Sequence, residues 1–253
     1  MKILFEDKHL LVCYKPAGIP VQSARVGARD CESILKNYLY KESPKKGGPY
    51  LGIVHRLDQP VEGLLVFAKT AEAAADLSRQ LQDKRMKKNY LAVRKTVDKS
   101  AGDSMEMVKD CGKTFKNVEK PVENWTEITD YLRKNTGENR SEIVKAGTAG
   151  AKKAVLLYRV LQVLAGQELV EIQLLTGRHH QIRLQMAGLG TPLVGDQKYG
   201  ADPADVDIVD KSYPALCAYR LEFLHPKTGK ALEFQIEPEN PAFAPFKMGS
   251  ISG

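Results

Sequence analysis

Apolar residues along this chain fall into short runs interrupted by glycine, proline and polar clusters, a pattern typical of strands joined by turns. Two of the later runs are separated only by Ala165-Gly166-Gln167, which predicts a hairpin. Because the predicted strands outnumber the helices and cluster in hairpins, we expect an α+β fold built on a mixed, mainly antiparallel sheet. The predicted strands are two segments within 3–14, then 51–54, 64–68, 89–97, 154–164, 168–175, 215–224 and 231–236.

Helical spacing is clearest after Thr70, whose residue type caps helix N-termini, and it predicts a helix over 71–86. The tail from Pro238 has several prolines and no apolar period, so we expect it at the surface. The remaining predicted helices cover 33–39, a short segment near 127–134, and 178–187, which Gly188 or Gly190 ends.

Length and composition place limits on the kind of protein. The 253 residues suffice for one large domain or two closely packed subdomains. No segment is long and apolar enough to span a membrane, and the first residues lack the apolar core of a secretory signal. We therefore expect a cytoplasmic monomer with no membrane partner. The four cysteines include no CxxC pair and are expected to be reduced thiols.

The charge favours a polyanionic partner. The formal net charge is +7, and seven basic residues against one acidic residue lie between Lys84 and Lys99. Charge alone leaves two interpretations of this basic segment open. It is a stripe that binds phosphates, or a solvated face that complements the dipole of the preceding helix.

One carboxylate stands out because of its position. Asp58 lies in a polar turn between two predicted strands, directly after His55, Arg56 and Leu57. A carboxyl with an ordinary pKa of about 3.9 is ionised at neutral pH and can act as a nucleophile. An aspartate in a turn more often only forms local hydrogen bonds, so the residue alone does not decide between these roles.

Further motifs extend this pattern. The segment 54–69, which includes His55-Arg56-Leu57-Asp58, resembles the HRLD signature of the RluA-type pseudouridine synthases, which convert a uridine in RNA into its C-glycoside isomer. The segments 88–93 (KNYLAV), 174–183 (LLTGRHHQIR) and 190–200 (GTPLVGDQKYG) are similar to further family motifs, in the family order. The resemblance covers 4–20, which includes a KPAG turn, and 51–97, 151–200 and 215–235.

The resemblance implies a long bent sheet with flanking helices and a central cleft that binds RNA. It implies that Asp58 is the nucleophile, that Tyr90 lines the pocket and assists proton transfer, and that Arg183 pairs with Asp58 and orients it. Arg56 is a candidate to fill the gap left by the flipped uridine, although a local salt bridge fits it equally. The expected substrate-binding residues are His55, Arg56, Leu57, Lys84, Arg85, Lys87, Lys88, Arg178 and Gln181.

The chain also departs from the family pattern. Val61-Glu62 replaces the usual Thr-Ser, placing a negative charge four residues after Asp58, and Cys217 stands where a histidine is common. We expect one catalytic domain over 1–253, with no N-terminal S4 domain and with 98–150 as an insertion or variable region.

These observations favour an RNA pseudouridine synthase that needs no cofactor and acts on ribosomal or transfer RNA. Attack at C6 of the base and attack at C1′ of the ribose stay open. The alternative is an inactive RNA-binding or ribosome-assembly protein, for which Val61-Glu62 is the support. A metal-dependent nuclease is disfavoured, because His179 and His180 would point about 100° apart on a helix and no carboxylate cluster accompanies them.

Overall fold

The computed structural model describes residues 1–25, 27–42, 47–96, 125–135, 137–200 and 213–247. These residues form one mixed sheet of 11 strands in the order β1-β2-β4-β10-β5-β9-β8-β6-β7, with β3 beside β4 and β11 beside β10. The pair β4–β10 is parallel and the other pairs are antiparallel. The expected α+β class, with a mixed and mainly antiparallel sheet, is confirmed.

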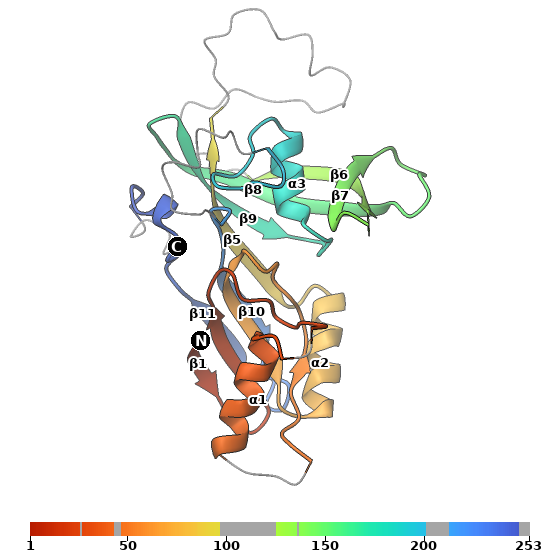
Figure 1. Ribbon diagram of the computed structural model, residues 1–253, viewed down its shortest axis with the longest axis vertical. Helices are drawn as coiled ribbons and strands as arrows, with labels where there is room; N and C mark the ends of the chain where they lie inside the picture. Colours follow the sequence, from red (N-terminus) through yellow and green to blue (C-terminus); the bar gives the residue numbers. More distant parts are fainter. Residues whose placement is uncertain (26, 43–46, 97–124, 136, 201–212, 248–253) are drawn as a thin grey trace, which may run out of the picture.

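Figure 1 shows two halves joined by β5 and β10. The lower half holds β1, β2, β4 and helices α1 and α2, and the upper half holds β6 to β9 and helix α3. The strands are β1 (Lys2–Glu6), β2 (Leu10–Lys15), β3 (Gly52–Ile53), β4 (Glu62–Ala68), β5 (Lys87–Lys95), β6 (Thr126–Asn135), β7 (Arg140–Val144), β8 (Lys152–Leu164), β9 (Gln167–Leu174), β10 (Leu216–Leu224) and β11 (Ala231–Gln235). The helices are α1 (Cys31–Glu42), α2 (Ala71–Gln82) and α3 (Gln181–Gly188).

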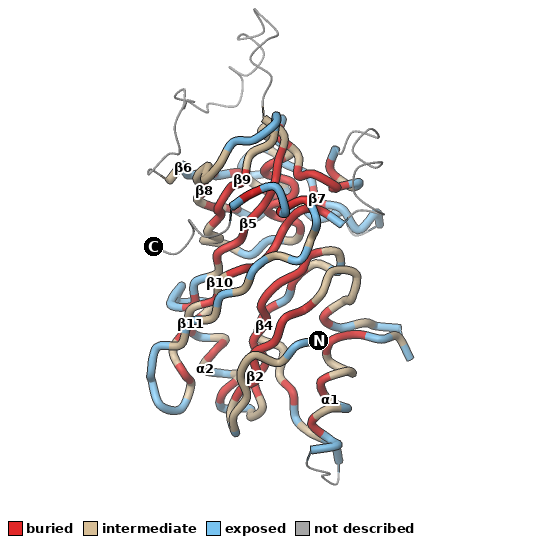
Figure 2. Tube along the Cα trace, turned by 90° about the vertical axis from the view of Figure 1, so that its left-hand side faces the viewer, coloured by how far each residue is buried: buried red, intermediate tan, exposed pale blue. Residues whose placement is uncertain are grey.

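The core of the lower half lies on both faces of β2 and β4, whose residues are all buried. On one face, Leu65 and Phe67 belong to the same apolar cluster as Leu35 of α1. On the other face, Leu64 and Val66 pack with Leu77 of α2. The two-residue period of a strand sends successive side chains to opposite faces, so each face needs its own helix. In Figure 2 buried residues follow β2 and β4 through the molecule.

Two predicted helix ends move inward in the structure, whereas α1 (Cys31–Glu42) extends beyond the predicted 33–39 at both ends. Thr70 caps α2 by accepting a hydrogen bond from the backbone N–H of Ala73 at 3.1 Å, as predicted. The helix ends at Gln82, because Lys84 has a left-handed backbone with φ of 59°. Helix α3 begins three residues later than predicted, because His180 also has a left-handed backbone, with φ of 52°.

Two predictions are wrong. The segment 127–134 lies in strand β6, not in a helix, since Ile128, Asp130 and Leu132 are buried at alternate positions. The tail is not confined to the surface, because Phe243 and Phe246 are 2% and 5% exposed and pack in an apolar cluster behind β10. Burial of these two rings compensates for the tail's lack of regular structure.

The predicted variable region 98–150 divides into two parts. Residues 97–124, which include Lys99 and Cys111, lie outside the described residues. From 125 onward the chain forms β6 and β7, and β6 pairs with β8 over seven residues, so this part belongs to the main sheet. The other three cysteines are free thiols, as predicted. None of the described helices has the length and apolar composition that crossing a membrane requires.

Candidate active site

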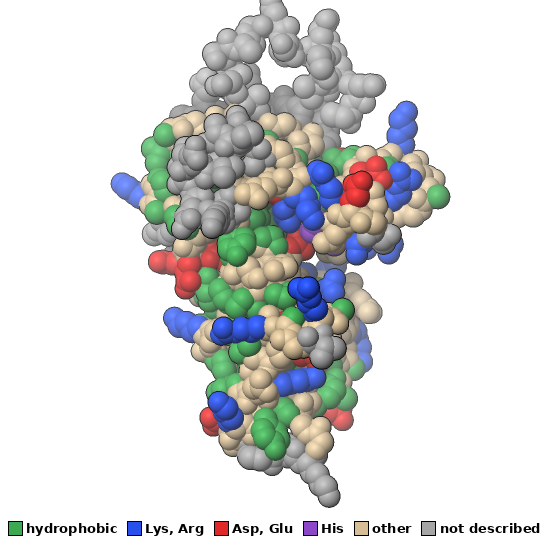
Figure 3. All heavy atoms as spheres, viewed as in Figure 1, with side chains coloured by type: hydrophobic (Ala, Val, Ile, Leu, Met, Phe, Trp, Pro, Cys, Tyr) green, Lys and Arg blue, Asp and Glu red, His purple; other side chains and the backbone are tan. Residues whose placement is uncertain are grey.

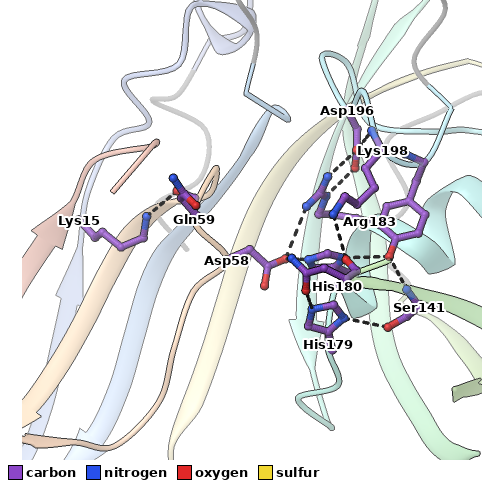
Figure 4. Close-up of polar contacts among 11 residues, drawn as sticks. Lys15, Asp58, Gln59, Ser141, His179, His180, Arg183, Asp196 and Lys198 are labelled. Atoms are coloured by element: carbon purple, nitrogen blue, oxygen red, sulfur yellow. Dashed lines mark hydrogen bonds and ion pairs between the residues drawn. The ribbon is translucent and has the colours of Figure 1, made fainter. Parts of the chain in front are cut away.

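The loop that carries Asp58 joins β3 to β4 and is tied to the turn that follows β2. The carbonyl of Gln59 accepts hydrogen bonds from the backbone N–H of Gly18 at 2.9 Å and from the Lys15 ammonium at 3.0 Å. Lys15 is fully buried and also donates to the carbonyls of Pro16 and Ile19. Two donors from the β2 turn therefore hold the backbone beside Asp58, and Figure 4 shows the contact between Lys15 and Gln59.

Arg183 approaches Asp58 from α3, on the other side of the cleft. Its Nη1 lies 3.8 Å from Asp58 Oδ2. Its closer partner is Asp196, which accepts from Nε at 2.7 Å and from Nη2 at 2.6 Å. Arg183 is 5% exposed and the Asp196 side chain is fully buried, so this bidentate pair fixes the guanidinium before any substrate binds.

The surroundings of Asp58 shift its pKa in opposite directions. Burial raises the pKa of its carboxyl, Arg183 lowers it, and Asp196 raises it again. Lys15 and Arg56 also lower the pKa, and the net shift is upward. The side chain keeps 28% of its surface exposed. Asp58 is thus a carboxylate with restricted solvation that remains open to the cleft.

Tyr90 lies in β5 and is 5% exposed. Burial raises the pKa of its phenol, and the negative charge of Asp58 raises it further. The phenol therefore keeps its hydrogen at neutral pH.

Two histidines to which the sequence motifs assigned no role border the site. His180 Nε2 lies 3.7 Å from Asp58 Oδ2, and its Nδ1 lies 2.8 Å from the hydroxyl of Tyr199. The ring of His179 stacks on that of His180 with centroids 3.7 Å apart. Burial and the nearby cations lower the pKa of His180 to about 3 and that of His179 to about 4. Among the described residues no group of three or more metal-ligating side chains is arranged around a metal site.

The other predicted binding residues around Asp58 divide by exposure. Arg56 is exposed beside Asp58, whereas Leu57 is buried in the main core. His55 is also buried, its Nε2 accepts from the backbone N–H of Val66 at 3.3 Å, and burial lowers its pKa to about 3. The sequence therefore places one polar side chain of this motif, Arg56, at the surface beside Asp58.

The motif at 174–183 and strand β5 supply three further predicted binding residues, Gln181, Arg178 and Lys88. Gln181 is buried and braces the loop, since its Oε1 accepts from Thr176 Oγ1 at 2.8 Å and from the backbone N–H of Arg178 at 3.0 Å. Arg178 itself is exposed, and its Nε donates to the carbonyl of Lys153. Lys88 lies close to Gly177, and burial lowers the pKa of its ammonium.

The basic segment 84–99 is partly neutralised. Arg85 pairs with Asp83, Lys87 with Glu222 and Arg94 with Glu168. Five other cations without an ion pair among the described residues border the cleft, and Figure 3 shows Lys and Arg side chains bordering a hollow between the two halves. These cations are Arg56, Lys134, Arg140, Arg178 and Lys198.

Glu62, whose negative charge lies four residues after Asp58, does not present that charge to the cleft. It is 3% exposed, and its carboxylate accepts from the hydroxyl of Tyr14 at 2.7 Å and from the backbone N–H groups of Glu239 and Asn240. Its function in the structure is to anchor the C-terminal tail to β4. Cys217, the other departure from the pattern, is fully buried in the same region.

Comparisons with known proteins find a matching family model and similar relatives. The family model described as RNA pseudouridylate synthase matches residues 9–188. "Ribosomal large subunit pseudouridine synthase D" of Nitrosomonas europaea is 37% identical over 237 residues, which are 92% of this chain and 60% of the relative. The protein of the same name from Zymomonas mobilis is 34% identical over 260 residues, 100% of this chain and 74% of the relative.

A solved structure shares the fold. "Human RNA Pseudouridylate Synthase Domain Containing 4" superposes with a TM-score of 0.68 at 22% identity, covering 94% of this chain and 89% of that chain. At this identity the likeness concerns the fold alone. The chain spans 60% of the length of the Nitrosomonas europaea relative.

Proposed function

Because the chain belongs to the RNA pseudouridylate synthase family, we propose that it isomerises uridines in RNA to pseudouridine. The observation that carries this proposal is the carboxylate of Asp58, held on a braced loop in the cleft and facing Arg183 and His180. The names of the relatives make large-subunit ribosomal RNA the first substrate to test, with transfer RNA as the second.

The proposed chemistry begins with Asp58. Arg183 and His180 both approach Oδ2, so Oδ1 is the oxygen that faces the substrate. It adds to the flipped uridine at C6 of the base or at C1′ of the ribose, and the bond between C1′ and N1 breaks. The uracil turns and C5 forms the new bond to C1′. Loss of the C5 proton, uptake of a proton at N1 and loss of the bond to Asp58 complete the isomerisation.

Tyr90 is proposed to line the uracil pocket and to relay the C5 proton. A phenol that keeps its own hydrogen can take up a proton only by passing that hydrogen on. The Asp58 carboxylate, released as the product forms, is the acceptor near it. Tyr90 thus acts as a relay with Asp58 and not as an independent base.

The exposed cations around the cleft are proposed to bind RNA phosphates. Arg56, Lys134, Arg178 and Lys198 have no acidic partner among the described residues, so a phosphate meets no competing carboxylate there. Arg56, beside Asp58, is proposed to fill the stacking gap left by the flipped base. The inactive alternative loses its support, since the charge of Glu62 is buried and hydrogen bonded.

The test is to incubate the purified protein with transcripts of large-subunit ribosomal RNA and of transfer RNA, and to map pseudouridine in each. We expect pseudouridine at defined positions, in equal yield with and without EDTA. Tight RNA binding with no pseudouridine in any transcript would support the inactive alternative. Loss of activity in EDTA would contradict the proposed metal-free chemistry.

A further inference from the structure

The imidazole of His180 lies between the Asp58 carboxylate and the hydroxyl of Tyr199 (Figure 4). His180 and Tyr199 are 8% and 9% exposed, so solvent has little access to the contact between them. His180 also has the left-handed backbone that opens α3, and its ring is stacked on His179. The imidazole is therefore fixed in orientation, and the position of its hydrogen decides what it offers to Asp58.

The hydrogen bonds of Tyr199 determine that position. The backbone N–H of Ser141 donates to the Tyr199 hydroxyl at 2.8 Å, so one lone pair of this oxygen is occupied. The hydroxyl carries a single hydrogen, and among the described residues its other hydrogen-bonding neighbour is Nδ1 of His180 at 2.8 Å. If Nδ1 donated instead, the hydroxyl would receive two hydrogens and its own would have no acceptor. Nδ1 is therefore the acceptor.

The imidazole is also neutral. Burial lowers the pKa of His180, and the neighbouring groups Arg183, His179, Lys198 and Lys134 lower it further, to about 3. A neutral imidazole carries one hydrogen, and with Nδ1 accepting, that hydrogen is on Nε2. Nε2 is the atom that faces Asp58 Oδ2, at 3.7 Å.

We propose that Tyr199 fixes His180 in the tautomer with hydrogen on Nε2, and that His180 thereby acts as a positioning residue that orients the Asp58 carboxylate together with Arg183. This proposal rests on the proposed function. His180 and Arg183 both approach Oδ2 of Asp58, so they determine which of its two oxygens remains available to the uridine. The tautomer itself is a property of the free protein and is measurable without turnover.

The first experiment reads the tautomer by side-chain ¹H–¹⁵N NMR of the histidines at neutral pH, with His180→Gln used to identify the His180 signals. We expect the pattern of an Nε2–H imidazole in the wild type and a mixture of tautomers in Tyr199→Phe. Tyr219→Phe is the matched control, because Tyr219 is also buried but donates to Glu171, away from the site. An Nδ1–H pattern in the wild type, or no change in Tyr199→Phe, would overturn the proposal.

The second experiment compares turnover of His180→Gln and His180→Leu. The glutamine amide can place an N–H near Asp58, whereas leucine cannot, so we expect kcat to fall about 100-fold in His180→Leu and to recover in part in His180→Gln, with KM little changed. Wild-type kcat in His180→Leu would overturn the positioning role. A wild type that forms no pseudouridine would contradict the proposed function, while the NMR pattern would still decide the tautomer.

Discussion

The pair between Arg183 and Asp196 gives a quantitative prediction. Asp196→Asn keeps the volume of the side chain and removes its charge, leaving a guanidinium that is 5% exposed with Asp58, at 3.8 Å, as the nearest remaining anion. Asp196 Oδ1 also accepts from the backbone N–H groups of Lys198 and Tyr199, at 3.0 and 3.3 Å. The substitution therefore perturbs the buried centre from which the loop 196–199 is organised.

The magnitude follows from the burial of both partners. Removing one member of a buried ion pair costs about 3–5 kcal/mol, and an asparagine that still accepts one hydrogen bond sets the expectation near the lower limit, about 3 kcal/mol. With an m-value of about 3 kcal/mol per molar urea, the unfolding midpoint should fall by about 1 M. Chemical denaturation followed by circular dichroism measures this shift.

The same substitution should also change the pH dependence of activity. Because Asp196 raises the pKa of Asp58, its neutralisation lowers that pKa and should move the acid limb of the kcat/KM profile to lower pH. Asp76→Asn is the control, since its 3.7 Å pair with Arg79 is partly exposed and contributes at most about 1 kcal/mol. A midpoint for Asp196→Asn no lower than that of Asp76→Asn would refute the reasoning.

Three further predictions concern the tail, the RNA surface and pH. Glu62→Gln weakens the bonds that anchor the tail and should lower the free energy of unfolding by about 1–3 kcal/mol, while the exposed Glu237→Gln should leave it unchanged in the same urea titration. Arg178→Ala should reduce the slope of log K against log salt for RNA binding by about 1, whereas Lys36→Ala, whose ammonium already pairs with a glutamate, should not. His55 has a folded pKa of about 3, below that of the unfolded chain near 6.5, so its contribution to stability is present above about pH 6.5 and is lost as pH falls towards 3. His55→Gln should therefore flatten the fall in unfolding free energy between pH 7 and pH 5, and an unchanged slope would contradict the burial of a neutral imidazole.

The strands could be predicted from sequence where burial is simple. Continuous apolar runs, as in β2 and β4, marked strands buried on both faces. The prediction of a helix over 127–134 is wrong because the sequence there does not show the apolar–polar alternation of a strand clearly. Asp130 is polar but buried, so the polar residues of this strand do not all lie on its exposed face. In the tail, the burial of Phe243 and Phe246 depends on a surface made by distant strands and has no periodic signal.

The candidate site, too, could be predicted from sequence only in part. The motifs identified Asp58 and Arg183, because a short segment carries each of them. They did not predict that Arg183 binds Asp196 more closely than Asp58, since that choice depends on how the loop after α3 folds back. Nor did they predict a structural role for Glu62, whose backbone donors come from the tail, 177 and 178 residues further along the chain.

The central claim is that the Asp58 carboxylate is the nucleophile, and Asp58→Asn tests it most directly. No hydrogen bond to the Asp58 side chain occurs among the described residues, so the variant should fold with the wild-type urea midpoint and still bind RNA. With RNA labelled with tritium at C5 of uridine, we predict tritium release by the wild type and none above background by Asp58→Asn. Tritium release by the folded variant at a rate comparable to the wild type would contradict the account.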